Sequence, residues 1–387
     1  MITDYIINLP TNLDKLFLDC YRNRCMKIAA LFKPGEEFFL NSNYINNDFQ
    51  KNIVHPVVLY ITMLPNSLIS ENSILQVEIL EGWIDLTLYS NYDNISGLNP
   101  DLKLLKKLDI RLEPRKNLPK GYKLASISII DKINKLRIEK DSWELLQIND
   151  SIEKTSDGFN AMRNIFHSPI LTESHLEAVF MKTIIERGFS IAYLPVCAGD
   201  SNAAYIHYSK NNMPIYNNVL LDCGARNPYG YCADITRSYP IHCRNNNLYR
   251  KVYDIVSNAK IACEKYIEDT LENGIVPTLS RLNAVCIETY IKQLHRILPR
   301  DLKVDRNIVN LFYTHFIGHH TGLVVHDIFS DSLIPGSVFT IEPGLYFNRS
   351  IVKIDINHKL FEIGGVRIED MYYITPEMTL ACLSSYI

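Results

Sequence analysis

The sequence lacks the surplus of basic residues that a protein held to nucleic acid by phosphate contacts usually carries. It has 40 Lys and Arg against 43 Asp and Glu, which gives a net charge of −3 with neutral histidines. It also lacks the low hydrophobicity of a disordered chain, because 47% of its residues are hydrophobic and 21% are charged. We therefore expect a folded protein without a nucleic acid partner.

Regularly spaced cysteines and long apolar runs are missing as well. The nine cysteines include no CxxC pair, so neither a disulfide framework nor a zinc ribbon is expected. The longest apolar stretch, residues 53–64, contains His55 and Pro56 and is too short to span a bilayer. The first apolar stretch contains Asp4 and has no basic flank before it, unlike a secretory signal. These absences predict a cytoplasmic protein with no membrane partner.

The chain length and the order of its patterns predict two domains. The 387 residues exceed the roughly 150 of an average domain. Residues 1–130 alternate short β-rich runs with turn signals, which indicates a small α/β domain. From residue 131 the spacing of apolar residues becomes helical, and helical stretches then alternate with strand-like runs. We expect an α+β domain over residues 131–387.

Four carboxylates lie on strand-like segments that are otherwise apolar. Asp222 follows a run of three apolar residues, and Asp234 follows it across the turn signal RNPYG, so both should lie on one hairpin. Glu342 lies in VFTIEPGLYF and Glu369 in GGVRIEDMYYIT. Each alone could cap a turn or end a strand, and Glu369 could face solvent. Together they indicate a cation, because burying unpaired charges is costly.

Four histidines lie within twelve residues of the segment HFIGHHTGLVVHD, at positions 315, 319, 320 and 326. Histidine is the commonest metal ligand and general acid or base. His315 and His319 have the spacing of a helical zinc-peptidase motif, but Phe316 stands where that motif needs glutamate. A structural role is an equal alternative for His320.

Carboxylates with one or two imidazoles form an oxygen-rich ligand set, which favours Mn²⁺, Co²⁺ or Zn²⁺. Two divalent ions would come close to neutralising four carboxylates. Such a pair, roughly 3.5–4 Å apart, could hold a bridging hydroxide for attack on a carbonyl or phosphoryl centre.

At this point the sequence resembles a known family. The segments LLDCGARNPYGYCADITRSYP, HFIGHHTGLVVHD, PGSVFTIEPGLYF and GGVRIED stand in the order found in the pita-bread metallopeptidases, and they are most similar to the Xaa-Pro-cleaving branch, aminopeptidase P and prolidase. AAYIHY, with His207, and LTESHLEAVFMKTIIERGFSIAYLPV agree. The resemblance covers about residues 135–380. It implies a pita-bread catalytic domain, and the position of residues 1–130 implies the smaller creatinase-like domain.

The resemblance also implies roles for individual residues. It implies that Asp222 binds one metal ion, that Asp234 and Glu369 bridge the pair, and that His319 and Glu342 hold the second ion. Glu342 would also take the proton of the bridging water. The remaining implied residues bind the substrate or shuttle protons: His207, His315, His326, Tyr346 and Arg367. Asp222 and Asp234 are twelve residues apart where the family usually has eleven, and Phe316 stands where the family has glycine.

The implied activity is hydrolysis of the bond between an N-terminal residue and proline, with two metal ions, Mn²⁺ first and Co²⁺ or Zn²⁺ as alternatives. The partners would be small peptides with proline in the second position, and a homo-oligomer, dimer or tetramer, is expected. We rank the dipeptidase (prolidase) marginally before an aminopeptidase P that acts on longer peptides. Below both we rank a non-catalytic pita-bread binding protein, a creatinase-like enzyme and a methionine aminopeptidase.

A dipeptidase needs a positive group near the metal ions, because the free carboxylate of a dipeptide lies within one residue of the scissile bond. Arg349, just after the Glu342 segment, is the candidate, since a guanidinium can bind a carboxylate through two parallel hydrogen bonds. The alternative is that Arg349 is a solvated arginine in a loop and has no role in the site.

Overall fold

The computed structural model describes residues 138–241 and 247–387, together with five strands of the preceding part of the chain. The chain divides into two compact units, Met1–Arg137 and Ile138–Ile387. The predicted boundary after residue 130 stays a prediction, because residues 115–137 lie outside the described part.

The first unit contains a five-stranded sheet in the order β2-β1-β3-β4-β5. Its strands are β1 (Met26–Lys33), β2 (Glu36–Asn41), β3 (Ile74–Leu80), β4 (Trp83–Ser90) and β5 (Ile110–Pro114). Neighbouring strands are antiparallel except β4 and β5, which are parallel. The β-rich runs ILQVEIL and IDLTLYS thus form neighbouring strands, whereas any helices of the predicted α/β domain lie outside the described residues.

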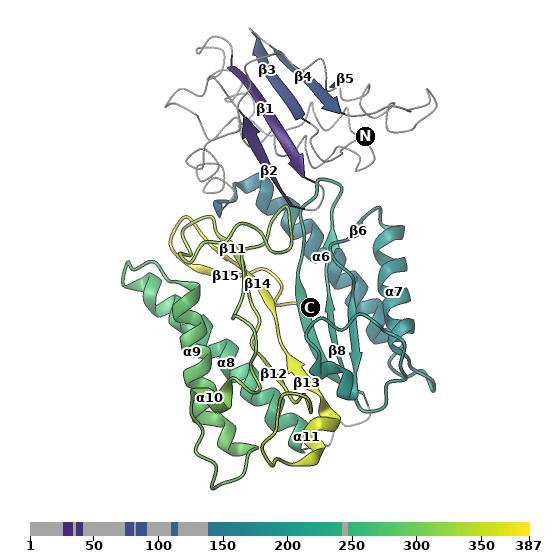
Figure 1. The fold of residues 1–387 in the computed structure, drawn as a ribbon, viewed down its shortest axis with the longest axis vertical. Helices are drawn as coiled ribbons and strands as arrows, with labels where there is room; N and C mark the ends of the chain where they lie inside the picture. Colours follow the sequence, from purple (N-terminus) through teal and green to yellow (C-terminus); the bar gives the residue numbers. More distant parts are fainter. Residues whose placement is uncertain are drawn as a thin grey trace. The chain divides into compact units, whose positions relative to one another are not determined.

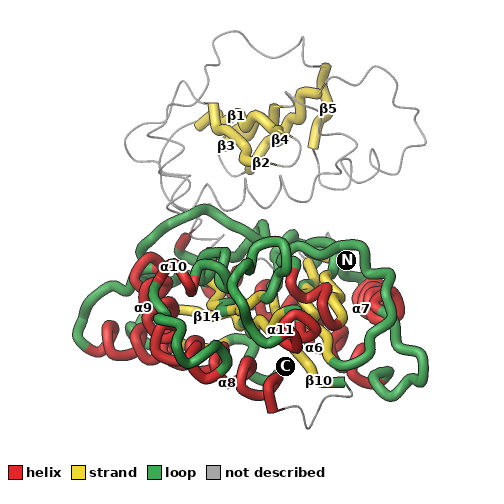
Figure 2. The backbone as a smooth tube through the Cα atoms, turned by 60° about the horizontal axis from the view of Figure 1, so that its bottom comes forward, coloured by secondary structure: helices red, strands yellow, loops and turns green. Residues whose placement is uncertain are grey.

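The second unit places strands between two groups of helices. Helices α8 (Asn247–Glu272) and α9 (Leu279–Gln293) lie on one side, and α6 (Ser142–Asn164) and α7 (Glu173–Glu186) lie on the other, in both views of the molecule (Figures 1 and 2). Shorter helical segments are η2 (Asp200–Ala204), η3 (Leu294–Arg296), α10 (Arg306–Val309) and α11 (His358–Ile363). None of the helices in the described part combines the length and apolarity of a membrane span.

The strands of the second unit pair in four small antiparallel sheets, in the orders β10-β8-β7, β11-β14-β15, β12-β13 and β6-β9. Their bounds are β6 (Ser190–Ile191), β7 (Val196–Gly199), β8 (Asn218–Cys223), β9 (Ala225–Arg226), β10 (Ile235–Pro240), β11 (Val338–Ile341), β12 (Gly344–Tyr346), β13 (Gly365–Arg367), β14 (Asp370–Ile374) and β15 (Leu380–Cys382). The segments predicted to carry the four carboxylates thus lie on or next to β8, β10, β11 and β14.

The hairpin from β8 to β10 sets the positions of the first two carboxylates. Asp222 pairs with Thr236, and Arg226 forms a bridge with Cys232, so one register runs along the whole hairpin. That register puts Asp234 two positions from Thr236 on the same face as Asp222. The turn over residues 227–231 contains Gly230 at φ +91°, a value typical of the glycine that closes a three-residue hairpin loop. The twelve-residue spacing is therefore absorbed in the turn without a slip of register.

Helix α6 holds this turn with polar side chains on its buried face. Ser151 donates to the carbonyl of Tyr231 at 2.8 Å, and Thr155 accepts from the amide of Ala225 at 2.8 Å. The Tyr231 hydroxyl donates to Glu144 at 2.9 Å. Because each bond is buried or partly buried, the helix fixes the hairpin more specifically than apolar packing would.

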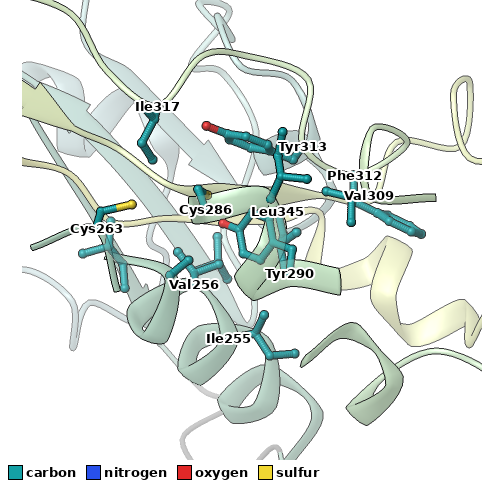
Figure 3. Packing of buried hydrophobic residues seen from close by; sticks show 14 of the residues in the cluster. Ile255, Val256, Cys263, Cys286, Tyr290, Val309, Phe312, Tyr313, Ile317 and Leu345 are labelled. Carbon is teal, nitrogen blue, oxygen red and sulfur yellow. The ribbon is translucent and has the colours of Figure 1, made fainter. Parts of the chain in front are cut away.

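The main apolar core lies between α8, α9 and the strands that flank Glu342 and Glu369. Val256 and Cys263 of α8 face Cys286 and Tyr290 of α9, with Leu345 of β12 beside them (Figure 3). Each is at most 2% exposed, and fully burying a large apolar side chain contributes about 1.5–3 kcal/mol. The predicted site therefore rests on a closely packed support.

Candidate metal centre

The five residues that the resemblance names as metal ligands come together in the second unit. Three groups of ligand atoms each lie within 4.8 Å of one another: Asp222, Asp234 and Glu369; His319, Glu342 and Glu369; and Asp234, His319 and His326. Because the groups share Asp234, His319 and Glu369, they form one continuous cluster rather than three separate sites.

Tyr193 joins the two hairpin carboxylates. Its hydroxyl lies 2.5 Å from Oδ1 of Asp222 and 2.6 Å from Oδ1 of Asp234. One hydroxyl carries one proton, so it donates to only one of the two oxygens at a time. The sequence analysis gave Tyr193 no role: it lies in the segment LTESHLEAVFMKTIIERGFSIAYLPV, which agrees with the family, but in a bend before β7 where no periodicity marks a site residue.

Glu369 and Glu342 complete the set of four carboxylates, and their surroundings in the protein differ. Glu369 is 2% exposed and accepts a hydrogen bond from Thr236 at 2.8 Å. Burial and the nearby carboxylates raise its pKa well above the ordinary value. Glu342 lies between β11 and β12, and burial raises its pKa to about 7 although His319 and Arg367 oppose the shift.

The donor set fits divalent cations. Burial raises the pKa of Asp222 as well as those of Glu342 and Glu369, so without a cation three of the four carboxyl groups resist ionisation. Four carboxylates and an imidazole are ligands that Mn²⁺ and similar ions accept. Among the described residues, Arg367 is the one Arg or Lys that forms an ion pair with the cluster. It cannot balance four carboxylates alone.

His319 is oriented as a ligand. Its Nε2 atom lies 3.3 Å from Oδ2 of Asp234 and 3.6 Å from Oε1 of Glu342. Its Nδ1 atom lies 3.1 Å from the carbonyl oxygen of His320, which can only accept, so Nδ1 carries a proton, and a metal ion would displace the second proton from Nε2. Burial lowers the pKa of His319, but Asp234 and Glu342 outweigh it and raise the pKa to about 9.

A chain of hydrogen bonds connects Asp222 to His315. Arg367 donates to Oδ2 of Asp222 at 2.5 Å and to the hydroxyl of Tyr346 at 2.8 Å. That hydroxyl lies 2.9 Å from Nε2 of His315, and Nδ1 of His315 donates to the carbonyl of Phe316 at 2.7 Å. Burial and Arg367 lower the pKa of His315 to about 3, so the imidazole is neutral near pH 7. The side chain of Phe316 is 38% exposed.

The other predicted histidines differ in their surroundings. The His326 ring is 4.1 Å from the His319 ring, centroid to centroid, and His326 is exposed. His207 is also exposed, and it contributes to lowering the pKa values of both His315 and His326. His320 is 1% exposed and its Nε2 lies 3.1 Å from the carbonyl of Ser330, which favours the structural alternative for this residue.

Arg349 is the predicted site residue that the structure does not bring to the cluster. It is exposed in the loop after β12, and its guanidinium carbon lies 4.6 Å from the centroid of the Phe361 ring. Within the described residues, its contacts do not link it to the carboxylates.

Solved structures with a similar fold include aminopeptidases. Proline aminopeptidase P II from Yersinia pestis superimposes with a TM-score of 0.67 over 97% of this chain and 96% of that chain, at 18% identity. The structure of a putative aminopeptidase P from Bacillus anthracis gives a TM-score of 0.61 over 96% of this chain and 93% of that chain, at 21% identity. The predicted α+β architecture of the pita-bread type is thereby confirmed.

Related sequences carry a similar name. The probable Xaa-Pro aminopeptidase of Talaromyces marneffei is 29% identical over 302 residues, which cover 68% of this chain and 63% of the relative. That of Emericella nidulans is 30% identical over 286 residues, covering 63% and 60%. The alignments therefore span less than two thirds of these relatives.

The model of metallopeptidase family M24 matches residues 147–376, which include every predicted ligand. The match spans more than half of the 387 residues. The predicted family is therefore confirmed, and this chain belongs to metallopeptidase family M24.

Proposed function

We propose that the chain is a dinuclear-metal Xaa-Pro peptidase, which hydrolyses the bond between an N-terminal residue and proline. The observation that carries the proposal is the meeting of four carboxylates and His319, whose ligand atoms lie in overlapping groups within 4.8 Å. Membership of family M24 and the names of the relatives support the same chemistry.

The ligands would divide between two cation positions. Asp222 would hold one ion, His319 and Glu342 would hold the other, and Asp234 and Glu369 would lie between them. Two divalent cations, which we propose to be Mn²⁺ with Co²⁺ or Zn²⁺ as alternatives, would polarise the substrate carbonyl and lower the pKa of water. Tyr193 would hold Asp222 and Asp234 in place, and Arg367 would hold Asp222, through the hydrogen bonds described above.

We assign proton transfer to Glu342 and substrate binding to the histidines near the cluster. The bond before proline has no N–H, and its nitrogen needs a proton in order to leave. Glu342 would accept a proton from the attacking water and pass it to that nitrogen. His207, His315 and His326 would bind the substrate. Because His315 is neutral and donates through Nδ1 to a carbonyl, its Nε2 would act as an acceptor, as it does toward Tyr346.

The ranking of the dipeptidase before the aminopeptidase, two enzymes that differ in the length of their substrate, changes here. The sequence motifs place the dipeptidase marginally first, but the relatives are named Xaa-Pro aminopeptidase, and Arg349 lies over Phe361. Arg367 is already paired with Asp222, so a dipeptidase without a further cation near the cluster would leave the substrate carboxylate unpaired. We therefore propose an aminopeptidase that accepts peptides longer than two residues, with the dipeptidase as the alternative.

The test is a comparison of Ala-Pro, Ala-Pro-Ala and Ala-Ala-Ala after reconstitution with Mn²⁺. We expect hydrolysis of Ala-Pro-Ala at the first bond, less of Ala-Pro and none of Ala-Ala-Ala. Asp234→Asn serves as the inactive control. A preference for Ala-Pro would restore the dipeptidase, and no cleavage of either proline peptide by metal-loaded protein would contradict the proposed activity. The expected homo-oligomer and cytoplasmic location stay predictions.

A further inference from the structure

Glu173 is a completely buried carboxylate that no mechanism described above uses. It lies in the first turn of α7 and is 0% exposed. A buried acidic side chain is normally paired with a cation or a metal ion. In the described part of the chain, no Lys, Arg or His forms an ion pair with Glu173, so its partners must be neutral donors.

Four neutral donors surround this carboxylate. Oε1 accepts from the amide of Gly199 at 2.8 Å and from the side-chain amide of Asn202 at 2.9 Å. Oε2 accepts from the hydroxyl of Tyr208 at 2.8 Å and from the amide of Met213 at 2.9 Å. Each oxygen thus has two donors, which suits an ionised, acceptor-only carboxylate. The donors are spread from the beginning to the end of residues 199–213.

The same segment packs against the strand that carries Arg367. A Cβ atom on Gly364 would lie 2.1 Å from the carbonyl oxygen of Asp200, and one on Gly365 would lie 2.3 Å from that of Ala203. The backbone of η2 therefore lies directly on the start of β13. Residues 199–213 are held from one side by Glu173 and from the other by this strand.

His207 lies within this segment, next to Tyr208. It is exposed, and it is close enough to His315 and His326 to affect the pKa of both. Glu173 contacts the hydroxyl of Tyr208 and the amides at both ends of the segment, so it can fix the backbone from which His207 extends.

We propose that Glu173 is a positioning residue, whose four hydrogen bonds hold residues 199–213 so that His207 faces the carboxylate cluster. The inference rests on the proposed function, because His207 is its proposed substrate-binding residue. In Glu173→Gln an NH₂ group replaces one acceptor oxygen and meets two donors. The segment then loses two of its four hydrogen bonds while the side chain keeps its size.

The test is a double-mutant cycle on Ala-Pro-Ala hydrolysis with Glu173→Gln and His207→Ala, singly and together. We expect Glu173→Gln to lower kcat/KM by about 10- to 100-fold at unchanged metal content. In the His207→Ala background it should have less than about a threefold further effect. Glu186→Gln is the matched control, since Glu186 ends the same helix and is exposed. Equal losses in both backgrounds would overturn the inference.

Two further measurements keep the inference testable on other grounds. If Glu173→Gln does not fold, Tyr208→Phe removes a single donor, and its smaller loss should also disappear in the His207→Ala background. Hydrogen exchange needs no activity: Glu173→Gln should accelerate exchange within residues 199–213 and leave α8 and α9 protected. Acceleration across the whole unit would overturn the inference. A wild type that cleaves no proline peptide would contradict the proposed function alone.

Discussion

Two neighbouring acidic residues, Glu369 and Asp370, are equally buried and have opposite electrostatic surroundings. Each is 2% exposed. Asp370 forms ion pairs with Arg237 and Lys260, and these outweigh burial and lower its pKa. Glu369 faces other carboxylates, and burial with their repulsion raises its pKa. The comparison separates a buried charge that the protein balances itself from one that a cation must balance.

The first prediction exchanges each carboxylate for its amide. Glu369→Gln should lower kcat on a proline peptide by more than about 100-fold, because the amide is a poorer metal ligand. Asp370→Asn should instead destabilise the protein by about 3–5 kcal/mol, because two partly buried cations lose an ion-pair partner. Steady-state kinetics and urea unfolding of both variants measure this. The comparison fails if the two variants lose activity and stability alike.

The second prediction concerns pH and the protein freed of metal by chelation. The pKa of His319 is raised from 6.5 in the unfolded chain to about 9 in the folded one. Its stabilising proton is therefore present below pH 6.5 and is lost as pH rises through 9. At about 1.4 kcal/mol per pH unit, the free energy of unfolding should fall by a few kcal/mol between pH 6.5 and 8.5.

Urea unfolding at several pH values tests the second prediction, with His319→Gln as the control. The variant loses the contribution of His319, so its free energy of unfolding should fall less steeply over the same interval, with the remaining decrease due to the carboxyl groups whose pKa values are raised. A chelated wild type whose stability stays constant or rises would mean that carboxylates do not surround His319.

The third prediction sharpens the comparison at Tyr193. Its hydroxyl contacts Asp222 and Asp234 but no cation, so Tyr193→Phe removes support from the metal ligands and leaves the Asp370 ion pairs untouched. We expect Mn²⁺ affinity to fall by about 10- to 100-fold. Calorimetric titration measures this. Tyr239→Phe is the control, since the Tyr239 hydroxyl is buried and, among the described residues, forms no hydrogen bond with a carboxylate.

The smallest effect is expected for Arg349→Ala. Because its guanidinium lies over Phe361, its removal should change kcat/KM by less than about threefold on both Ala-Pro and Ala-Pro-Ala. A selective loss on Ala-Pro would restore the role that the sequence suggested for this arginine, and with it the dipeptidase.

The sequence was informative where a polar residue broke a local apolar pattern. The four carboxylates and the cluster of histidines stand out on strand-like segments, and the turn signal RNPYG predicts the hairpin that joins Asp222 and Asp234. These features depend on neighbours along the chain, so the pattern is visible before folding.

Residues that act through distant partners left no such signal. Tyr193 becomes a partner of Asp222 only when segments 29 residues apart in the chain meet, and Glu173 contacts Met213 from 40 residues away. A Tyr in a bend and a Glu in the first turn of a helix are ordinary residues in sequence. The position of Arg349 over Phe361 depends on the path of a loop, which no periodicity predicts.

The central claim is that the carboxylate cluster around Glu369 binds two cations, in contrast to the ion pairs around Asp370. Calorimetric titration of the chelated 387-residue chain with Mn²⁺, checked by elemental analysis after dialysis, tests it most directly. The account predicts two ions bound per chain in the wild type and fewer than two in Asp234→Asn. A wild type that binds no Mn²⁺, or an Asp234→Asn variant that binds two ions as tightly as the wild type, would contradict it.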